Sequence, residues 1–333
     1  MSSTMQPHDR LIRDLLSNTK RAAQYLTSVL PSSITEAYDF ERLRRVPTDF
    51  VTPRFREKRV DMLLFVPRRG AAAGDRSAGL LLYVLFEHLS TPDPLTPLRL
   101  LGYQVTLWEQ WLRDLPREHS RVGLRLPPIL PLVLYQGKAT WTVAPDMQAM
   151  LNLDGLQEST REALMPYLVN QRYMLQNLGT TRDEDIGPRG MVRVTLLMMK
   201  HIKSRDILRV LASLQQELAE EIANDRAGEA ISDLHEVRMV LRYILMASEY
   251  VDTRQLADAV EPLGEQIKEI AVTEGERLIA TGFRKGLEEG LEKGRREERL
   301  SMARNLLREG MAPETVARLT KLPLSQVKGL ALS

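Results

Sequence analysis

The stretch that decides the fold is Leu80–Leu89, with the sequence LLLYVLFEHL. Its first seven residues, Leu80 to Phe86, are all apolar. Such a run is too short to span a membrane, and its bulky side chains are typical of a central strand buried on both faces of a sheet. Glu87 and His88 follow, and a carboxylate at the end of an apolar strand is costly to desolvate unless it meets a cation. The sequence therefore predicts a charged site at the rim of a sheet.

A second apolar strand is expected at Val60–Val66, VDMLLFV, with Asp61 near its start. The segment between the two strands is rich in glycine and small residues and predicts a hairpin loop, so that the strands lie antiparallel. The start of the first strand then lies beside the end of the second, which brings Asp61 close to Glu87. Two such carboxylates raise each other's pKa unless a cation or a basic group separates them. An all-oxygen site of this kind suits a hard cation such as Mg2+.

Other segments support this pair of strands. Helical spacing of apolar residues is found over residues 8–30 and 97–115, while short strands are expected at residues 43–46, 126–135 and 167–175. From Met191 onward the pattern is helical, with expected helices at residues 191–202, 206–222 and 234–250. We therefore expect an α/β fold with a mixed sheet flanked by helices, followed by an all-helical C-terminal region.

Composition bounds the class of protein. The chain has 333 residues, of which 43% are hydrophobic, and it has no cysteine, so disulfides and thiolate metal sites are excluded. The N-terminus lacks the apolar core of a signal peptide, and there is no run of about 18 apolar residues, so we expect a soluble cytoplasmic protein without a membrane partner. The net charge of +2 is too small to indicate a nucleic-acid partner by itself.

The local charge is more informative. Between Glu41 and Arg59 the basic residues outnumber the three acidic ones, and they are Arg42, Arg44, Arg45, Arg54, Arg56, Lys58 and Arg59. Arg54, Arg56, Lys58 and Arg59 lie just before the Asp61 strand and are the candidate DNA-binding residues. An ordinary solvated surface face would give the same pattern.

The C-terminal region has a different period. Gly282, Gly286, Gly290 and Gly294 recur every fourth residue in a segment dense in charged residues. This pattern favours a soluble, self-associating helix that is weakened by its glycines. Residues 301–333 have the spacing of a helix-turn-helix, which could bind DNA or serve as a plain interaction module. The expected domains are 1–180 (the α/β domain), 191–270 (helical), 271–300 (glycine-spaced helix) and 301–333 (helical tail).

Several of these blocks together carry a family resemblance. They are His8-Asp9, VDMLLF around Asp61, FEHLSTPD around Glu87, LPPILPLVLYQG at residues 126–137, the glycine repeat and the terminal segment. In this order they resemble the Rpn family of recombination-promoting nucleases, also labelled "putative transposases", within the PD-(D/E)XK nuclease superfamily. The resemblance implies that residues 1–180 form a nuclease-like domain with a restriction-endonuclease-like fold. It also implies a DNA endonuclease in which Asp61, Glu87 and the backbone carbonyl of His88 bind Mg2+ (or Mn2+).

One position departs from the family pattern. The family usually has Gln two residues after the Glu, and the wider superfamily has Lys, whereas this chain has Leu89. Leucine can neither orient water nor stabilise charge. Either the role has moved to Gln104 or Arg99 on the following helix, or the activity is weak or lost.

Three hypotheses remain. The first is a metal-dependent endonuclease that hydrolyses phosphodiester bonds of double-stranded DNA, associated with recombination or mobile elements, with Asp61, Glu87 and Gln104 as catalytic residues. The second is a catalytically impaired DNA-binding or oligomeric adaptor. The third is a structural assembly protein organised by the glycine-spaced helix, which leaves the two carboxylates unexplained.

Overall fold

The computed structural model describes residues 7–46, 61–72, 79–87, 92–115, 123–137, 139–227 and 234–331. These residues divide into two compact units, Met1–Val272 and Thr273–Ser333, which are described separately below. The division into four domains expected from sequence stays a prediction.

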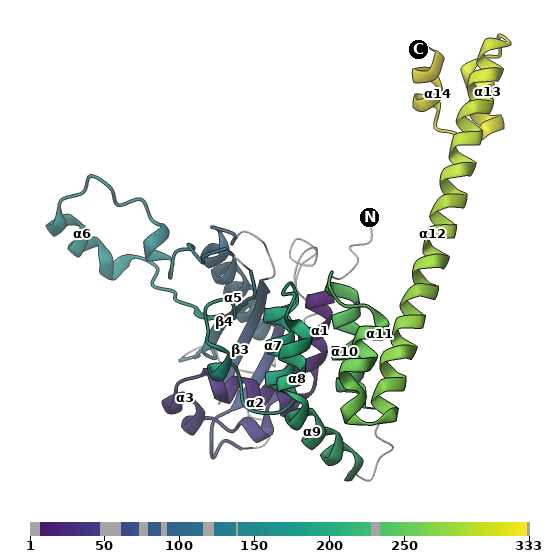
Figure 1. Ribbon diagram of the computed structural model, residues 1–333. Helices are drawn as coiled ribbons and strands as arrows, with labels where there is room; N and C mark the ends of the chain where they lie inside the picture. Colours follow the sequence, from purple (N-terminus) through teal and green to yellow (C-terminus); the bar gives the residue numbers. More distant parts are fainter. Residues whose placement is uncertain are drawn as a thin grey trace. The chain divides into compact units, whose positions relative to one another are not determined.

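A mixed sheet lies at the centre of the first unit (Figure 1). In the described chain it has five strands in the order β1 (Arg44–Val46), β2 (Asp61–Pro67), β3 (Gly79–Glu87), β4 (Ile129–Tyr135) and β5 (Met174–Asn177). β1, β2 and β3 are antiparallel neighbours, whereas β3, β4 and β5 run parallel. The predicted central strand and its antiparallel partner are therefore confirmed, with β3 in the middle of the sheet.

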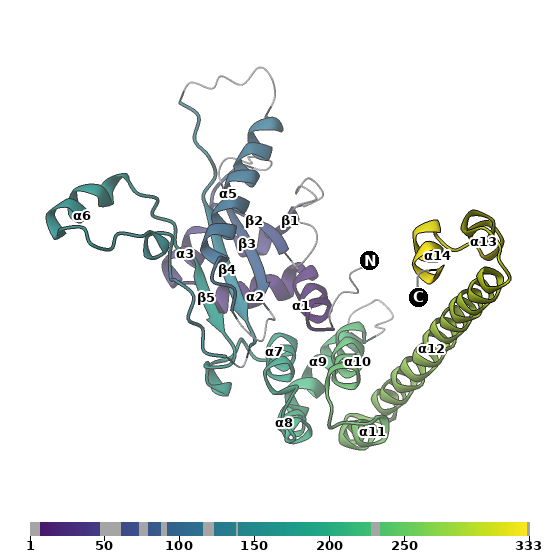
Figure 2. The same cartoon turned by 90° about the horizontal axis from the view of Figure 1, so that it is seen from above.

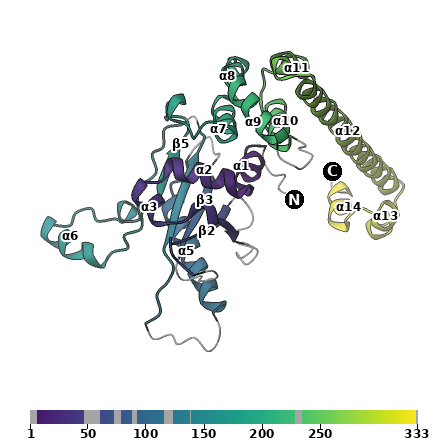
Figure 3. The same ribbon diagram turned by 90° about the horizontal axis from the view of Figure 1, so that it is seen from below.

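The two faces of the sheet pack against different helices (Figures 2 and 3). One face contributes Leu63, Phe65, Leu81 and Val133 to an apolar cluster with Leu100, Tyr103 and Leu107 of α5 (Thr96–Arg113). The other face contributes Met62, Leu64, Leu82 and Leu134 to a larger core with α1 (Pro7–Ser17), α2 (Thr19–Val29) and α7 (Met191–His201). This arrangement confirms the predicted α/β class of mixed sheet flanked by helices, because both faces of the strands are covered as their continuous apolar runs require.

The N-terminal segment forms two helices, although sequence predicted one over residues 8–30. The helical segment is interrupted at Asn18, which is the N-cap residue of α2. Its Oδ1 accepts hydrogen bonds from the backbone N–H groups of Lys20 (3.0 Å) and Arg21 (3.4 Å). The short helix α3 (Ser32–Ala37) and the 3-10 turn η1 (Phe40–Arg42) then lead into β1.

The connection from β4 to β5 is a long excursion that projects from the sheet (Figures 1 and 2). It contains the 3-10 turn η2 (Gln148–Met150), helix α6 (Glu158–Leu164) and the 3-10 turn η3 (Met165–Tyr167). The strand predicted at residues 167–175 is displaced, because β5 begins only at Met174. Pro166 lies in η3, where its fixed φ and missing N–H suit a turn better than a strand.

Helices complete the first unit. The 3-10 turn η4 (Asp183–Asp185) leads to α7, which is followed by α8 (Ile207–Ser213), α9 (Gln215–Ala227), α10 (His235–Ala247), α11 (Thr253–Val260) and η5 (Glu261–Leu263). The helix predicted over 206–222 is divided at Leu214 into α8 and α9. Buried residues of these helices, as far along the chain as Ala271, belong to the same hydrophobic core as the sheet residues. The helices and the sheet of the first unit therefore share one core.

The second unit contains most of α12 (Glu265–Arg308), then α13 (Pro313–Thr320) and α14 (Leu324–Ala331). The end of α12, α13 and α14 share a small core of Ala303, Val316, Leu322 and Val327. The connections turn at Gly310 and Lys321, both with positive φ. The predicted all-helical C-terminal region is confirmed. No helix in the described part of the chain is both long and apolar enough to cross a membrane.

Candidate functional site at the edge of the sheet

The register of the central strands places Asp61 and Glu87 near one another. Asp61, the first residue of β2, pairs with Leu85 of β3, and Glu87 is two residues further along the same strand. Such diagonal neighbours lie roughly 7–8 Å apart in an antiparallel pair. By the alternation of the pleat, positions 61 and 87 belong to the face of the sheet that α5 covers. We call these two residues the sheet-edge pair.

The pair lies at the edge where the three parallel strands end. Glu87 pairs with Tyr135 at the end of β4, and Tyr135 pairs with Asn177 at the end of β5. Sites in sheets with parallel strands are commonly built at this carboxyl edge, because connecting segments leave the sheet there. The edge thus joins two acidic positions that are 26 residues apart in sequence.

Gln104 lies away from this edge. It is buried, and its Nε2 donates a hydrogen bond of 3.1 Å to the carbonyl oxygen of Ile129 at the start of β4. Ile129 pairs with Leu81, six residues before Glu87, which corresponds to roughly 20 Å along the strand. The structure therefore does not bring Gln104 beside the sheet-edge pair. The hydrogen bond from Gln104 instead joins α5 to the start of β4.

Arg99 lies in the first turns of α5, which begins nine residues after Glu87. Its guanidinium group is 2.7 Å from the carboxylate of Asp93, whose other oxygen accepts a bond from the Leu95 amide. This ion pair braces the start of α5 against the segment that leads out of β3.

Other predicted site residues lie outside the described chain. These are His88, Leu89 and the basic residues Arg54, Arg56, Lys58 and Arg59, and the description of Asp61 and Glu87 is limited to their backbone. Among the side chains that are described, no group of three or more His, Asp or Glu is placed to hold a metal ion. The donor chemistry of the sheet-edge pair still fits a hard cation, since both residues are carboxylates.

Arg42, Arg44 and Arg45 of the predicted basic strip are described, and all three are exposed. The Arg44 guanidinium lies over the Phe65 ring, 4.5 Å from its centroid, and Arg42 donates to the Ala71 carbonyl oxygen (3.3 Å). This end of the strip therefore packs against β2 and its loop while leaving charge at the surface.

A buried polar cluster that sequence analysis missed lies at the same edge of the sheet. His8 Nδ1 and the Tyr243 hydroxyl share a hydrogen bond of 2.6 Å, and Gln136 Nε2 donates to that hydroxyl over 3.5 Å and to the Met199 carbonyl oxygen. We call His8, Gln136 and Tyr243 the His8 network. Gln136 directly follows Tyr135, the register partner of Glu87. The network therefore fixes α1 and α10 to the chain as it leaves β4.

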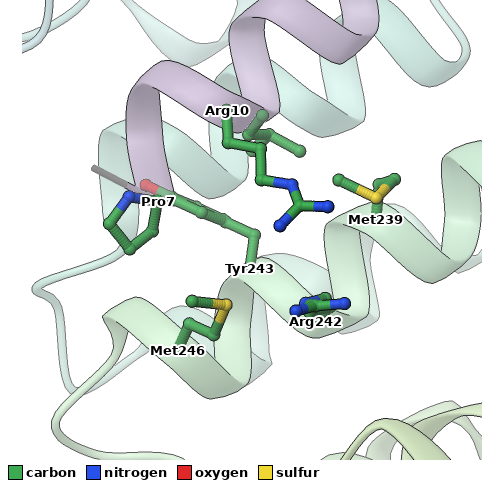
Figure 4. A pocket seen from close by; sticks show the side chains of 7 residues that line it. Pro7, Arg10, Met239, Arg242, Tyr243 and Met246 are labelled. Carbon is green, nitrogen blue, oxygen red and sulfur yellow. The ribbon is translucent and has the colours of Figure 1, made fainter. Parts of the chain in front are cut away.

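The His8 network is buried, and this burial affects the pKa of its tyrosine. His8 and Tyr243 are 6% and 2% exposed, and burial raises the pKa of the Tyr243 hydroxyl above its ordinary value, although the Gln136 bond acts in the opposite direction. Tyr243 also borders a small pocket between α1 and α10, where Arg10, Met239, Arg242 and Met246 surround it (Figure 4). His8 and Gln136 each lie in a block that carries the family resemblance, His8-Asp9 and residues 126–137, but the sequence did not indicate their contact with Tyr243.

An ion-pair cluster holds the loop that follows β5. The carboxylate of Asp183 receives hydrogen bonds from Lys200 Nζ (2.7 Å) and His201 Nε2 (2.8 Å), both on α7. Desolvation alone would raise the pKa of Asp183, but the bonds from Lys200 and His201 outweigh it and lower that pKa below its ordinary value of 3.8. The loop leaving this edge is thereby fastened to the helical layer.

The fold and this edge define an α/β protein with acidic positions from two adjacent strands at the carboxyl edge of a mixed sheet. The model of one protein family, described as "Putative transposase, YhgA-like", matches residues 6–229, and the chain belongs to this family. The match includes every strand of the sheet and both residues of the sheet-edge pair.

Named relatives extend the similarity over most of the chain. The inactive recombination-promoting nuclease-like protein RpnE of Escherichia coli strain K12 is 23% identical over 96% of this chain and 96% of its own length. The recombination-promoting nuclease RpnA of the same strain is 24% identical over 95% of this chain and 94% of its own. RpnD of Escherichia coli O157:H7, also named a recombination-promoting nuclease, is 25% identical over 83% of this chain and 95% of its own. The resemblance to the Rpn family is confirmed. No solved structure matches the chain.

Proposed function

We propose that this protein is a metal-dependent endonuclease that hydrolyses phosphodiester bonds of double-stranded DNA and acts in recombination or with a mobile element. The observation that carries the proposal is the register of β2 and β3, in which Asp61 and Glu87 are diagonal neighbours at the carboxyl edge of the sheet. Membership of a family whose relatives include proteins named recombination-promoting nucleases supports it.

Asp61 and Glu87 would hold Mg2+ or Mn2+, with the backbone carbonyl of His88 as a further ligand. A bound divalent cation lowers the pKa of a coordinated water and offsets charge that develops on a scissile phosphate. The carboxylates themselves would fix the position of the cation at the edge, and the basic residues Arg54, Arg56, Lys58 and Arg59 just before β2 would bind the DNA backbone electrostatically.

A second candidate function is a DNA-binding or oligomeric adaptor that has kept the fold without the chemistry. The observation that favours it is Leu89, which stands where the family usually has Gln and leaves no polar group at that position. The relative RpnE, aligned over nearly the whole chain, is itself named inactive.

The test is cleavage of supercoiled plasmid DNA by the purified full-length protein, with Mg2+, with Mn2+ and with EDTA. We expect nicking that requires the metal, and a loss of roughly 100-fold or more in Asp61→Asn and in Glu87→Gln, because each variant removes one anionic ligand at nearly constant shape. Asp154→Asn, an exposed carboxylate next to α6, is the matched control and should cleave like the wild type.

Two further results separate the candidates. DNA binding without cleavage under any metal condition would overturn the endonuclease and support the adaptor. Cleavage that appears only in Leu89→Gln would show that Leu89 has silenced an otherwise complete site.

A further inference from the structure

The C-terminal end of the chain folds around a small core of its own. The last turns of α12, together with α13 and α14, bury Ala303, Val316, Leu322 and Val327 (Figure 1). α13 and α14 have eight residues each, and residues 321–323 connect them. Two short helices joined by a turn of three or four residues, often with glycine, form a helix-turn-helix. Here Lys321 adopts the left-handed conformation that glycine commonly provides in such a turn.

The two sides of α14 differ. Val327 is fully buried in the small core and Leu330 packs against it. The other side carries Leu324, Ser325, Lys328 and Gly329, which are all exposed. These four residues share one side of the helix because they are three to five positions apart or adjacent. We call them the outer face of α14, and the described chain does not cover it.

The charge of this end of the chain is strongly positive. From residue 299 to residue 333 six basic residues face two acidic ones, Glu309 and Glu314, which gives a net charge of +4, whereas the whole chain carries only +2. The six are all exposed, and they are Arg299, Arg304, Arg308, Arg318, Lys321 and Lys328. No acidic residue follows Glu314 in the sequence. Such a surface attracts the phosphates of a nucleic acid.

The outer face of α14 has the chemistry to enter the major groove of DNA. The second helix of a helix-turn-helix lies in that groove, and its N-terminal residues contact the base edges. Ser325 is the second residue of α14, and serine and lysine side chains both bond to base edges in the major groove. A Cβ atom placed on Gly329 would meet no heavy atom within 4 Å, so this position leaves room for the close approach of a DNA backbone.

One ion pair lies at the edge of this surface. Lys328 Nζ is 3.4 Å from a carboxylate oxygen of Glu314, and the two side chains are 56% and 62% exposed. Exposed pairs of this kind contribute little to stability, so Lys328 can exchange Glu314 for a phosphate at low cost. Because the first helix of a helix-turn-helix crosses the DNA backbone, Glu314 at the start of α13 would repel that backbone.

We propose that α13, α14 and the end of α12 form a helix-turn-helix that binds double-stranded DNA, with the outer face of α14 in the major groove. The proposal goes beyond the endonuclease, because it assigns a second DNA-binding surface that shares no residue with the sheet-edge pair or with the basic residues before β2.

The test is binding of the full-length protein to a fluorescein-labelled duplex of mixed sequence and about 30 base pairs, followed by anisotropy in EDTA. Ser325→Glu should weaken binding roughly tenfold, although an acidic residue near the start of a helix stabilises that helix. Ser325→Gln, of the same size without the charge, should stay within about threefold of the wild type. Glu314→Gln should bind roughly threefold more tightly, because it removes a repulsive charge and frees Lys328.

Lys328 and a matched control give the electrostatic part of the answer. Lys328→Ala should weaken binding and lower the slope of log Kd against log salt concentration by about one, because one phosphate contact is lost. Arg209→Ala on α8, which also removes one exposed positive charge, should change neither. Far-UV circular dichroism of each variant checks that the helices are intact.

DNA binding by the first unit has to be separated from binding by α14. All variants are therefore measured again in a chain in which the basic residues before β2 are neutral, with Arg54→Gln, Arg56→Gln, Lys58→Gln and Arg59→Gln. The same ranking of variants should appear in this background. A duplex whose cytosines carry glucosylated 5-hydroxymethyl groups should bind more weakly, because the sugar fills the major groove.

Two results would overturn the proposal. The first is binding in the neutralised background that is unchanged in Ser325→Glu and Lys328→Ala, or no binding at all, either of which would leave the helix-turn-helix as a module without DNA. The second is equal affinity for the glucosylated and plain duplexes. Loss of plasmid cleavage while the α14 variants still change DNA binding would count only against the endonuclease.

Discussion

Two leucines show the difference between the sheet and the long helix. Leu134 of β4 is fully buried and belongs to the core shared with α1, α2 and α7, whereas Leu287 of α12 is 55% exposed. The two side chains have the same chemistry, so what differs is whether the rest of the chain supplies a partner. The strands are held by contacts within the chain, while the middle of α12 offers apolar surface that the described chain leaves uncovered.

The comparison separates two uses of apolar residues. In the sheet they determine which strands pair and in what register, and the register in turn determines that Asp61 and Glu87 lie together. In the middle of α12, Phe283, Leu287 and Leu291 are more than half exposed and belong to no apolar core of the described chain. The following experiments test this division, beginning with the largest expected effect.

Shortening the two leucines should give opposite results. Leu134→Ala should lower the free energy of unfolding by about 2–5 kcal/mol, because it leaves a cavity in a close-packed core. Leu287→Ala should change it by less than about 0.5 kcal/mol, because that side chain is 55% exposed. Urea denaturation followed by far-UV circular dichroism measures both. Equal losses in the two variants would show that Leu287 packs within its own chain.

Two glycines sharpen the same comparison. A Cβ at Gly79 of β3 would collide with the buried Phe65 ring and lie 2.9 Å from the Val66 carbonyl oxygen, so Gly79→Ala should cost roughly 1–3 kcal/mol of stability. A Cβ at Gly286 meets nothing in the described chain, so Gly286→Ala should stabilise α12 by up to about 1 kcal/mol. Thermal and urea unfolding curves of both variants check the signs, and a stabilising Gly79→Ala would contradict the packing at the start of β3.

The His8 network should show that polar contacts inside the chain matter too. Tyr243→Phe removes the hydroxyl that binds His8 and Gln136, leaving their polar atoms buried, and should cost about 1–2 kcal/mol. Tyr250→Phe is the control, because Tyr250 is 42% exposed and should change stability by less than about 0.5 kcal/mol. Indistinguishable urea midpoints for the two variants would mean that the network contributes nothing to holding α1 and α10.

The smallest expected effect is on the pH dependence of stability. The folded-state pKa of Asp183 is below 3.8, so its contribution is fully present above the unfolded-state pKa and is lost as pH falls through the lower folded value. Asp183→Asn should therefore be less stable than the wild type at pH 6, by less than about 1 kcal/mol because the carboxylate is partly exposed, and the difference should shrink toward pH 3. Urea titrations at both pH values measure it. A difference that grows on acidification would contradict the assigned ion pairs.

Much of the sheet could be predicted because its signals are local. The apolar runs at Leu80–Phe86 and Val60–Val66, with a connection rich in glycine and small residues between them, predicted β2, β3 and their antiparallel pairing. That pairing in turn predicted the proximity of Asp61 to Glu87. Other boundaries failed where the local signal was weak. The break at Asn18 was missed because apolar residues stay in phase on both sides of it, and β5 was displaced because Pro166 and its neighbours form a turn.

The sequence by itself determined the fold class, the central strand, the acidic pair and the family, because periodicity, apolar runs and ordered motifs are properties of neighbouring residues. Only the tertiary structure decided that Gln104 binds the start of β4 and that Gln136 and Tyr243 meet although 107 residues separate them. It also decided that Leu287 of α12 is uncovered within the described chain. The physical reason is that these are contacts, or missing contacts, between distant segments, and they exist only once the packed chain has fixed which surfaces face one another.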